Sequence, residues 1–234
     1  ELRAALAVEH DIERTVFGEG EIFIGSGVET MSRAPWSMPK PDRVPTFKPP
    51  KMWDTTVGWR YDNPRMDELY PIISLGETAE NIADEMQITR EDQDAFAVES
   101  HTRAINAINE GRFKGEIVAI QVPQRKGDPV IVDTDEHPRY TRENGHCHLA
   151  TSVEDMAALQ PSFRKGGTVT AGNSSGINDG AAALLLMRQS EAERRGLSPL
   201  ARIVAHAGHA QAPNLFTSAP VTAIQRVLAR SGWS

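Results

Sequence analysis

One stretch, TVTAGNSSGINDGAAALLLM at residues 168–187, constrains the fold of this 234-residue chain more than any other. Its residues 172–176 are two glycines, two serines and an asparagine, and the residues from 181 on are wholly apolar. These patterns predict a short strand at 168–170, a turn at 171–179 and a buried strand at 181–187. The small turn residues let the backbone approach a ligand closely, and their hydroxyls and amides can hydrogen-bond it. Composition alone favours a purely structural turn, because Gly and Asn so often serve turns.

Local patterns along the rest of the chain predict an α/β protein. Residues 2–17 have helical spacing, and EIFIGSG at 21–27 predicts a buried strand that ends in a glycine turn. A helix, a strand and a glycine turn in this order indicate an α/β layer. Further helices are predicted at 74–86, 89–111, 153–167, 190–196 and 221–233, and further strands at 116–122, 128–133 and from 200 on.

Two of these helices have clear boundary signals. Ser74 and Glu77 have the spacing of a capping box, and Thr89 precedes acidic residues in the first turn of the next helix. Gly111 is a natural stop for that helix. One face of it is expected to be buried, made of Ala95, Val98, Thr102, Ile105 and Ile108. By contrast, residues 136–152 carry little periodicity and are expected to be irregular.

A proline-rich stretch at 35–71 interrupts this pattern. Its prolines forbid regular helix or central strand. The same stretch holds Trp36, Trp53, Trp59 and Tyr61. Because disordered segments are poor in aromatic residues, we expect an ordered, packed excursion, with a disordered linker as the alternative.

Composition sets limits on function. The chain is 39% hydrophobic and 24% charged, which is ordinary for a globular protein of one large or two smaller domains. Its formal net charge of -7 argues against a broad surface for nucleic acid or an anionic membrane. No apolar run is long enough to span a bilayer, and no segment has the pattern of a signal peptide. The single cysteine, Cys147, excludes an internal disulfide framework and fits a reducing compartment.

Three motifs resemble those of the thiolase family. TAGNSSGINDGAAALLLM at 170–187 is similar to the family's TAGNxSGxNDGAAA, GSGVETMSRAPW at 25–36 to its GGxExMSxAP, and GETAENIA at 76–83 to its GxTAEN. All three occur in family order, and the resemblance covers essentially the whole chain. One such motif would be suggestive, whereas three in order are highly specific.

The resemblance implies a fold and a domain plan. The fold would be α/β, a thiolase-like layered α/β/α/β/α core with an inserted loop domain, incomplete in this chain. Residues 1–29 and 166–196 would belong to the N-terminal half of the core. Residues 30–165 would form the loop domain, and residues 197–234 the start of the C-terminal half.

The family's catalytic motifs are missing from this sequence. Thiolases cleave or form 3-oxoacyl thioesters of coenzyme A with an activated cysteine, and the motifs CxSG, NEAF, GHP and a late CxGG carry their catalytic residues. None of the four occurs here, so no catalytic residue is assigned. The chain begins at Glu1 rather than Met, and we expect truncation, with an altered first helix as the alternative.

The chain's own cysteine and histidines do not replace these motifs. Cys147 lies in the wrong part of the family order. His146 and His148 flank Cys147, which suggests a metal site. Adjacent residues of an extended segment point to opposite sides and seldom bind one ion without a third ligand, so no metal site is assigned. His209, in AGHAQA, lies before the place of NEAF and lacks the sequel of GHP.

The resemblance implies that this chain contains residues that recognise coenzyme A. Ser175 matches the family serine on the pantetheine arm, and Arg139 matches the loop-domain arginine near the nucleotide phosphates. The segment between Arg139 and Thr151 is longer than the family pattern. The other positions assigned to the coenzyme A site are Met156, Leu159, Gly176 and, facing the acyl pocket, Leu75. A surface or core role is the alternative for each single position.

Two functions remain open on the sequence. The first is a thiolase of fatty acid metabolism, as in beta-oxidation, that works by ping-pong acyl transfer. The second is a thiolase-like, non-catalytic coenzyme A or lipid-binding protein. Coenzyme A is expected as a substrate, with no tightly bound cofactor and no metal. The expected partners are acyl-CoA or coenzyme A and further copies in a homodimer or homotetramer, with no nucleic acid and no membrane span. The expected location is the cytoplasm, or an organelle matrix in a eukaryote.

Overall fold

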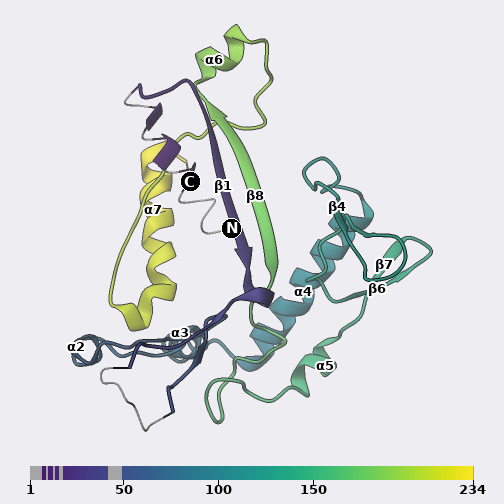
Figure 1. Ribbon diagram of the computed structural model, residues 1–234. Coiled ribbons are helices and arrows are strands. Elements are labelled where there is room, and N and C mark those ends of the chain that lie inside the picture. Colours follow the sequence, from purple (N-terminus) through teal and green to yellow (C-terminus); the bar gives the residue numbers. More distant parts are fainter. Residues whose placement is uncertain (1–6, 9, 13, 16–17, 42–48, 234) are drawn as a thin grey trace. The chain divides into compact units, whose positions relative to one another are not determined.

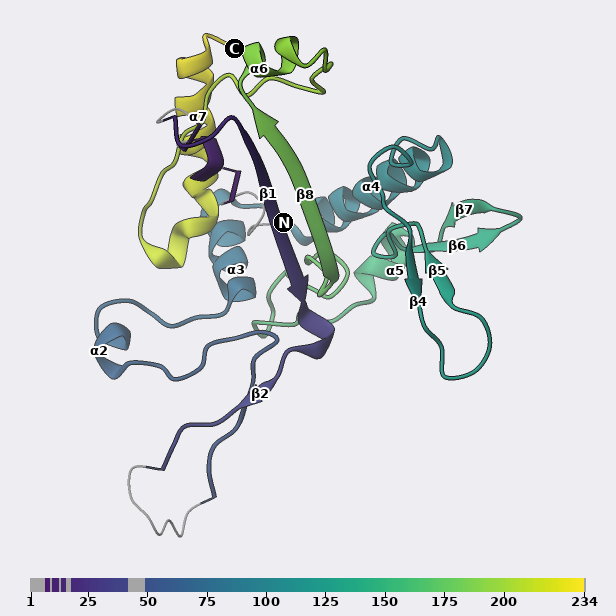
Figure 2. The same ribbon diagram turned by 45° about the horizontal axis from the view of Figure 1, so that its top comes forward.

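A computed structural model describes residues 7–8, 10–12, 14–15, 18–41 and 49–233 of the chain. The chain divides into two compact units, Glu1–Ile72 with Ile177–Ser234 and Ile73–Gly176 (Figures 1 and 2). The helix predicted at 2–17 is helical at the residues described there up to 15, and its other residues lie outside the described part. No helix in the described part is both long and apolar enough to cross a membrane.

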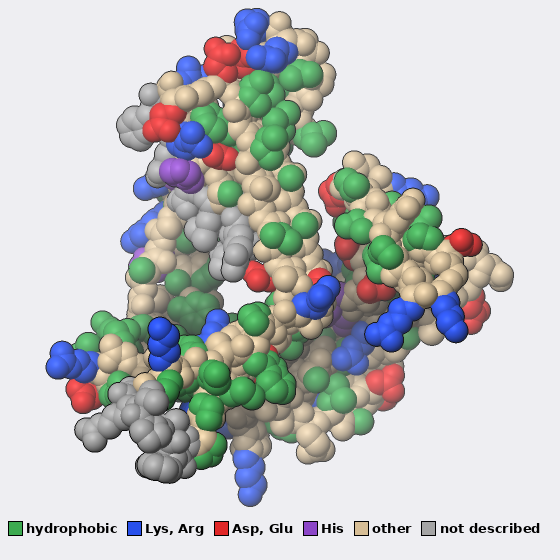
Figure 3. Space-filling model, viewed as in Figure 1, with side chains coloured by type: hydrophobic (Ala, Val, Ile, Leu, Met, Phe, Trp, Pro, Cys, Tyr) green, Lys and Arg blue, Asp and Glu red, His purple; other side chains and the backbone are tan. Residues whose placement is uncertain are grey.

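The first unit contains two long antiparallel strands, β1 Ile22–Thr30 and β8 Asp179–Met187, which pair along their full length. Both strand predictions are confirmed, with ends shifted by a few residues. The glycine turn predicted at the end of the first strand is wrong, because Gly25 and Gly27 pair with Leu184 and Ala182 inside β1. Their predicted burial is wrong in part, because Phe23 is buried while Ile24 and Leu185 are largely exposed. The described residues form only a two-stranded sheet here, so hydrophobic side chains stay exposed along the pair (Figure 3).

One end of this strand pair is tied to the turn that follows β1. The short 3-10 helix η1, Met31–Arg33, places the Ser32 N–H 2.9 Å from Asp179 Oδ1, and the Ser32 hydroxyl donates to Oδ2. Both hydrogen bonds, the hydroxyl's above all, lower the pKa of the Asp179 carboxyl. The motif at 25–36 and the motif at 170–187 therefore meet at this contact.

The proline-rich stretch is only partly packed. It contains β2 Trp36–Ser37, paired with β3 Trp53–Asp54, and the short helix α2 Pro64–Asp67. The ring centroids of Trp53 and Tyr61 lie 4.6 Å apart. The prediction of packed aromatics is wrong for Trp36 and Trp59, which are largely exposed, because a two-residue strand pair offers no apolar layer to cover them.

The last part of the first unit is helical. It contains α6 Gln189–Arg194, the 3-10 helix η2 Pro213–Ser218 and α7 Ala219–Ser231, which confirms both helices predicted there. The strand expected from residue 200 on is wrong, since residues 201–212 form neither helix nor strand. The carbonyls of His206 and Gly208 instead accept from Arg230 and Arg226 of α7, at 2.6 and 2.9 Å. Such isolated donors cannot replace the regular ladder that a strand needs.

The second unit is built on two capped helices, α3 Leu75–Met86 and α4 Arg90–Asn109. Ser74 Oγ accepts from Glu77 N at 3.2 Å, and Thr89 Oγ1 accepts from Asp92 N at 3.1 Å. Both predicted N-terminal caps are thus confirmed, and each satisfies a backbone N–H that has no partner inside its helix.

The buried face of α4 differs from the prediction at its first position. Ile105 is buried as expected, but Ala95 is exposed and Asp94 is buried in its place. Asp94 is buried because its carboxylate accepts hydrogen bonds from Arg90 and Asn173 within this unit. The spacing of apolar residues cannot predict the burial of such a polar residue.

Two hairpins complete the second unit: β4 Ile120–Val122 with β5 Val130–Val132, and β6 Tyr140–Glu143 with β7 His146–Leu149 (Figure 2). The first confirms both predicted strands in shortened form. The second overturns the prediction that residues 136–152 are irregular. Asn144 and Gly145 have φ values of 50° and 80°. These suit a tight two-residue hairpin turn, for which Asn-Gly is a strong signal.

The segment that leads to the small-residue turn is less regular than predicted. The helix expected at 153–167 is α5 Val153–Ala157 and ends well before the glycines, because Pro161 cannot continue it. The strand expected at 168–170 is a single bridge between Thr170 and Pro161. The predicted loop domain, 30–165, overlaps the second unit but has different limits, and it stays a prediction.

Candidate functional site

The turn after residue 167 is built on a buried carboxylate. Glu80, on α3, is 1% exposed. Its oxygens accept from the N–H groups of Thr168, at 2.9 and 3.0 Å, and Val169, at 2.8 Å, and from the Thr168 hydroxyl at 3.1 Å. A carboxylate that accepts several hydrogen bonds fixes the entry of the turn far more firmly than a single neutral bond does. Glu80 lies in the GETAEN motif, which by itself gives no sign of this role.

The middle of the turn is closed by its own side chains. Asn173 Oδ1 accepts from Thr170 N at 2.7 Å, and Asn173 Nδ2 donates to Thr168 O at 3.0 Å. The Thr170 hydroxyl, fully buried, accepts from Gly172 N at 3.1 Å. The Ser174 hydroxyl donates to Thr170 O at 2.6 Å. The side chains of these polar residues are therefore used inside the turn.

A second buried carboxylate links the turn to α5. Asp94, at the start of α4, accepts from Asn173 Nδ2 at 2.9 Å and from Arg90 Nε at 2.7 Å. The other end of the Arg90 guanidinium donates to the carbonyls of Met156 and Leu159, at 2.6 and 3.0 Å. One chain of charged and polar contacts thus fixes both the turn and the end of α5.

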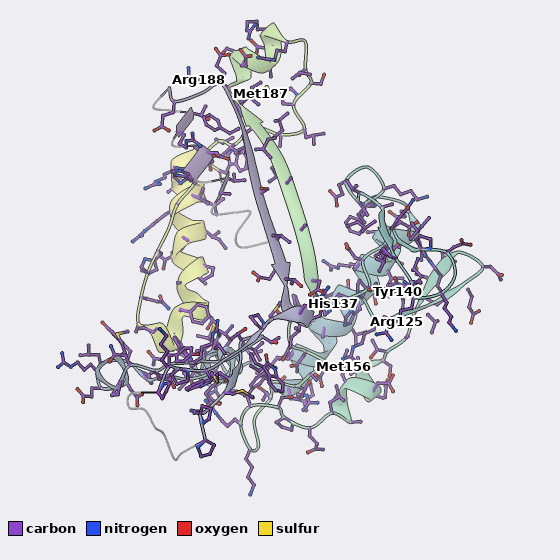
Figure 4. All side chains as sticks on the ribbon, viewed as in Figure 1. Arg125, His137, Tyr140, Met156, Met187 and Arg188 are labelled. Atoms are coloured by element: carbon purple, nitrogen blue, oxygen red, sulfur yellow. The ribbon has the colours of Figure 1, made fainter. Side chains whose placement is uncertain are left out.

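Gly172 lets the same two apolar residues pack directly against the turn. A Cβ at this position would lie 2.6 Å from Leu159 Cδ1 and closer still to Met156 Sδ. Met156 is fully buried (labelled in Figure 4), whereas Leu159 is half-buried. Met156 therefore supports the turn from beneath, and Leu159 keeps part of its surface free.

Arg139 joins this group from the segment before the β6–β7 hairpin. Its Nη2 donates to the carbonyl of Ala171, in the turn, at 3.1 Å, while the side chain stays exposed. His101 of α4 lies next to its backbone. Burial, and then the nearby Arg139 and His137, lower the pKa of the His101 imidazole. No sequence motif pointed to His101.

Ser175 and Gly176 end the turn and are exposed. Among the described residues, the Ser175 hydroxyl has no hydrogen-bond partner, in contrast to the neighbouring Ser174. Leu75 is the first residue of α3 and is 73% exposed. The predicted site residues other than Leu75 thus belong to one turn and the segments fixed to it.

Cys147 is unsuited to act as an exposed nucleophile in this structure. It is 2% exposed, and Asn109 of α4 holds its backbone through bonds of 2.8 Å to both its N–H and its carbonyl. His146 and His148 lie on the opposite face of β7, with ring centroids 4.9 Å apart. Within the described part of the chain, no three potential metal ligands lie together.

Comparison with known proteins decides the family. The family described as "Thiolase, N-terminal domain" matches residues 4–190. The chain belongs to the thiolase family. It is 43% identical over 217 residues to an acetyl-CoA acetyltransferase of Pseudomonas aeruginosa, covering 93% of this chain and 52% of the relative. It is 42% identical over 211 residues to a beta-ketoadipyl-CoA thiolase of Acinetobacter baylyi, covering 90% and 50%.

A solved thiolase-family structure has the same fold. The crystal structure of the Bacillus anthracis acetyl-CoA acetyltransferase matches 98% of this chain and 54% of its own, with a TM-score of 0.83 and 34% identity. The α/β thiolase fold predicted from the three motifs is therefore confirmed. The chain spans about half the length of the curated thiolase relatives it matches.

Proposed function

We propose that this chain supplies coenzyme A-binding residues to a thiolase, an acyltransferase that cleaves or forms 3-oxoacyl-CoA. One observation carries the proposal. The turn uses the hydroxyl of Ser174 internally and leaves that of Ser175 exposed, without a partner among the described residues. A rigid turn of small residues with one free hydroxyl is suited to hold the amide-rich pantetheine arm.

Each predicted site residue has a proposed role around this turn. Ser175 would hydrogen-bond the pantetheine arm, and Gly176 would let the arm approach the backbone. Arg139, exposed and attached to the turn through Ala171 O, would contact the phosphates. Leu159 would line the channel, with Met156 beneath it, and Leu75 would face the acyl group.

The proposed reaction is ping-pong acyl transfer. A cysteine thiolate attacks the 3-oxo carbon of the 3-oxoacyl-CoA, the bond between C2 and C3 breaks, and C2 takes a proton and leaves as acetyl-CoA. The thiol of coenzyme A then loses its proton and attacks the shortened acyl group on the cysteine, which forms a new acyl-CoA and frees the cysteine thiolate. The nucleophile and the groups that move protons are not among this chain's residues, and Cys147 is too buried to take their place. The whole protein would combine these groups with the coenzyme A site described above.

The substrate and pathway belong to the proposal as well. Fatty acid degradation by beta-oxidation is one setting. Relatives named for beta-ketoadipyl-CoA make a dicarboxylic 3-oxoacyl thioester a second candidate. Comparing kcat/KM of the whole protein for acetoacetyl-CoA and beta-ketoadipyl-CoA separates the two. We further propose a homodimer or homotetramer in the cytoplasm, with coenzyme A as a substrate and no tightly bound cofactor.

Replacing Ser175 with alanine in the whole protein is expected to weaken the binding of coenzyme A substrates by about threefold to tenfold, which is the effect of losing one neutral hydrogen bond. If the contact is equal in the ground and transition states, KM rises while kcat stays nearly constant. The measurement is steady-state kinetics beside a thermal melt.

Ser174→Ala is the matched control, because its hydroxyl bonds Thr170 O inside the turn. This variant should lower the melting temperature, whereas Ser175→Ala should leave it unchanged. An unaltered KM with a lowered melting temperature for Ser175→Ala would refute the ligand role.

The 234-residue chain by itself is expected to show no thiolysis of acetoacetyl-CoA, since its sequence holds none of the four catalytic motifs. Thiolysis by this chain that Cys147→Ser abolishes would contradict that expectation. The same assay on the whole protein tests the alternative of a non-catalytic carrier, which would bind coenzyme A without turning over any 3-oxoacyl-CoA.

A further inference from the structure

Arg139 is held at three points by three different segments of the second unit. Its N–H donates to His101 Nδ1, on α4, at 3.4 Å. Its carbonyl accepts from Ala150 N, just after β7, at 2.9 Å. Its guanidinium donates to Ala171 O, in the turn, at 3.1 Å. Residues far apart in the sequence thus fix where this exposed cation points.

The β6–β7 hairpin makes this arrangement rigid. The bond between Arg139 O and Ala150 N closes the hairpin at its base, so the residues that enter and leave the hairpin lie side by side. Asn109 anchors the hairpin to α4 through the backbone of Cys147. The backbone of Arg139 is therefore fixed on its carbonyl side by the hairpin, and on its N–H side, among the described residues, by His101.

We propose that His101 is a positioning residue for Arg139, and that it links the binding of the phosphate-bearing end of coenzyme A to pH. The inference rests on the proposed coenzyme A function. An imidazole nitrogen accepts a hydrogen bond only when it carries no proton. Protonated His101 would present an N–H to the N–H of Arg139, so the contact would be lost and Arg139 released on that side.

The surroundings of His101 favour the neutral, accepting form. Its ring lies 6.0 Å from that of His137, centroid to centroid, and the Arg139 charge is adjacent (His137 is labelled in Figure 4). The residues one helical turn away on α4, Ala97, Val98, Ala104 and Ile105, are all uncharged. Burial first, then the nearby Arg139 and His137, lower the pKa of His101 below its usual value near 6.5.

The sign of the pH effect follows from this. A histidine with a lowered pKa in the folded state is neutral there at pH 7, and the stabilising contact is complete above its unfolded pKa. The contact is lost as the pH falls through the folded pKa. Coenzyme A affinity should therefore fall more steeply on acidification than the phosphate's own titration requires.

The test measures coenzyme A binding to the whole protein by calorimetry between pH 5.5 and 8.5. His101→Asn keeps an acceptor near the position of Nδ1 but does not titrate, whereas His101→Leu removes the acceptor. At pH 8 we expect His101→Asn to bind within about twofold of wild type and His101→Leu to bind about threefold to tenfold more weakly. Once the pH has fallen through the folded-state pKa of His101, wild type should have lost about threefold relative to His101→Asn.

Two controls isolate the effect. The phosphate monoester of coenzyme A itself titrates near pH 6, and the difference between wild type and His101→Asn removes that contribution. His137→Asn removes the other imidazole and should keep a fall in affinity on acidification, moved to higher pH because one group that lowers the pKa of His101 is gone. Pantetheine, which lacks the nucleotide phosphates, should bind all variants equally.

The outcomes separate the two proposals. A wild-type protein that binds no coenzyme A at any pH overturns the proposed function and the inference with it. Wild type that binds coenzyme A with the same pH profile as His101→Asn, or more tightly at low pH, overturns the inference alone. So does an equal loss of pantetheine affinity in His101→Leu, which would indicate a general structural role. If His101→Leu does not fold, the comparison of wild type with His101→Asn decides by itself.

Discussion

Replacing Glu80 with alanine is expected to lower the free energy of unfolding of the whole protein by about 3–5 kcal/mol, because the buried N–H of Val169 and the half-buried N–H and hydroxyl of Thr168 lose their acceptor. Glu80 is 1% exposed, so water cannot reach these groups without opening the structure. The turn that carries Ser175 should lose its fixed entry at the same time. We therefore expect coenzyme A affinity to fall with stability, as measured by chemical denaturation and by binding.

Two further variants serve as comparisons, the conservative Glu80→Gln and the exposed control Glu85→Ala. Glutamine keeps the volume and one acceptor oxygen but sets an amide N–H against backbone donors, so it should cost about 1.5–3 kcal/mol. Glu85 lies on the same helix and is exposed, so its replacement should stay within about 0.5 kcal/mol of wild type. Equal effects of Glu80→Ala and Glu85→Ala would show that the buried carboxylate does not hold the turn.

Gly172→Val should be the most damaging single change at the turn itself. A Cβ there already overlaps Leu159 and Met156, and Met156 is fully buried. Gly172→Ala should cost about 1–3 kcal/mol by overpacking, and valine should cost more. Thermal melts of the two variants beside wild type measure the effect.

A coupled substitution tests the cause. Met156→Ala alone should cost about 2–5 kcal/mol through the cavity it leaves. Combined with Gly172→Val it should cost less than the sum, because valine fills part of that space. Gly115→Ala is the control, since its Cβ would meet nothing within 4 Å and its φ is not positive. Strict additivity of Met156→Ala and Gly172→Val would exclude direct packing as the reason for glycine.

Signals that act within a few residues were enough to predict much of the fold. Ser74 and Thr89 cap the helices that follow them, and Gly111 and Gly232 end theirs, because each of these effects depends only on the local backbone. The β6–β7 hairpin was missed although Asn144-Gly145 is a local signal. Its strands are four residues long each, too short for alternation to stand out.

Contacts between residues that are far apart in the sequence could be identified only in the tertiary structure. The sequence by itself determined the thiolase family, the capped helices and the small-residue turn with Ser175 in it. Only the structure decided that Glu80 and Asp94 are the carboxylates beneath that turn, that Gly172 makes room for Met156, and that His101 lies against Arg139. The physical reason is that a buried polar residue is stabilised by partners the chain brings to it from far away, and no local pattern of hydrophobicity or spacing records which partners those will be.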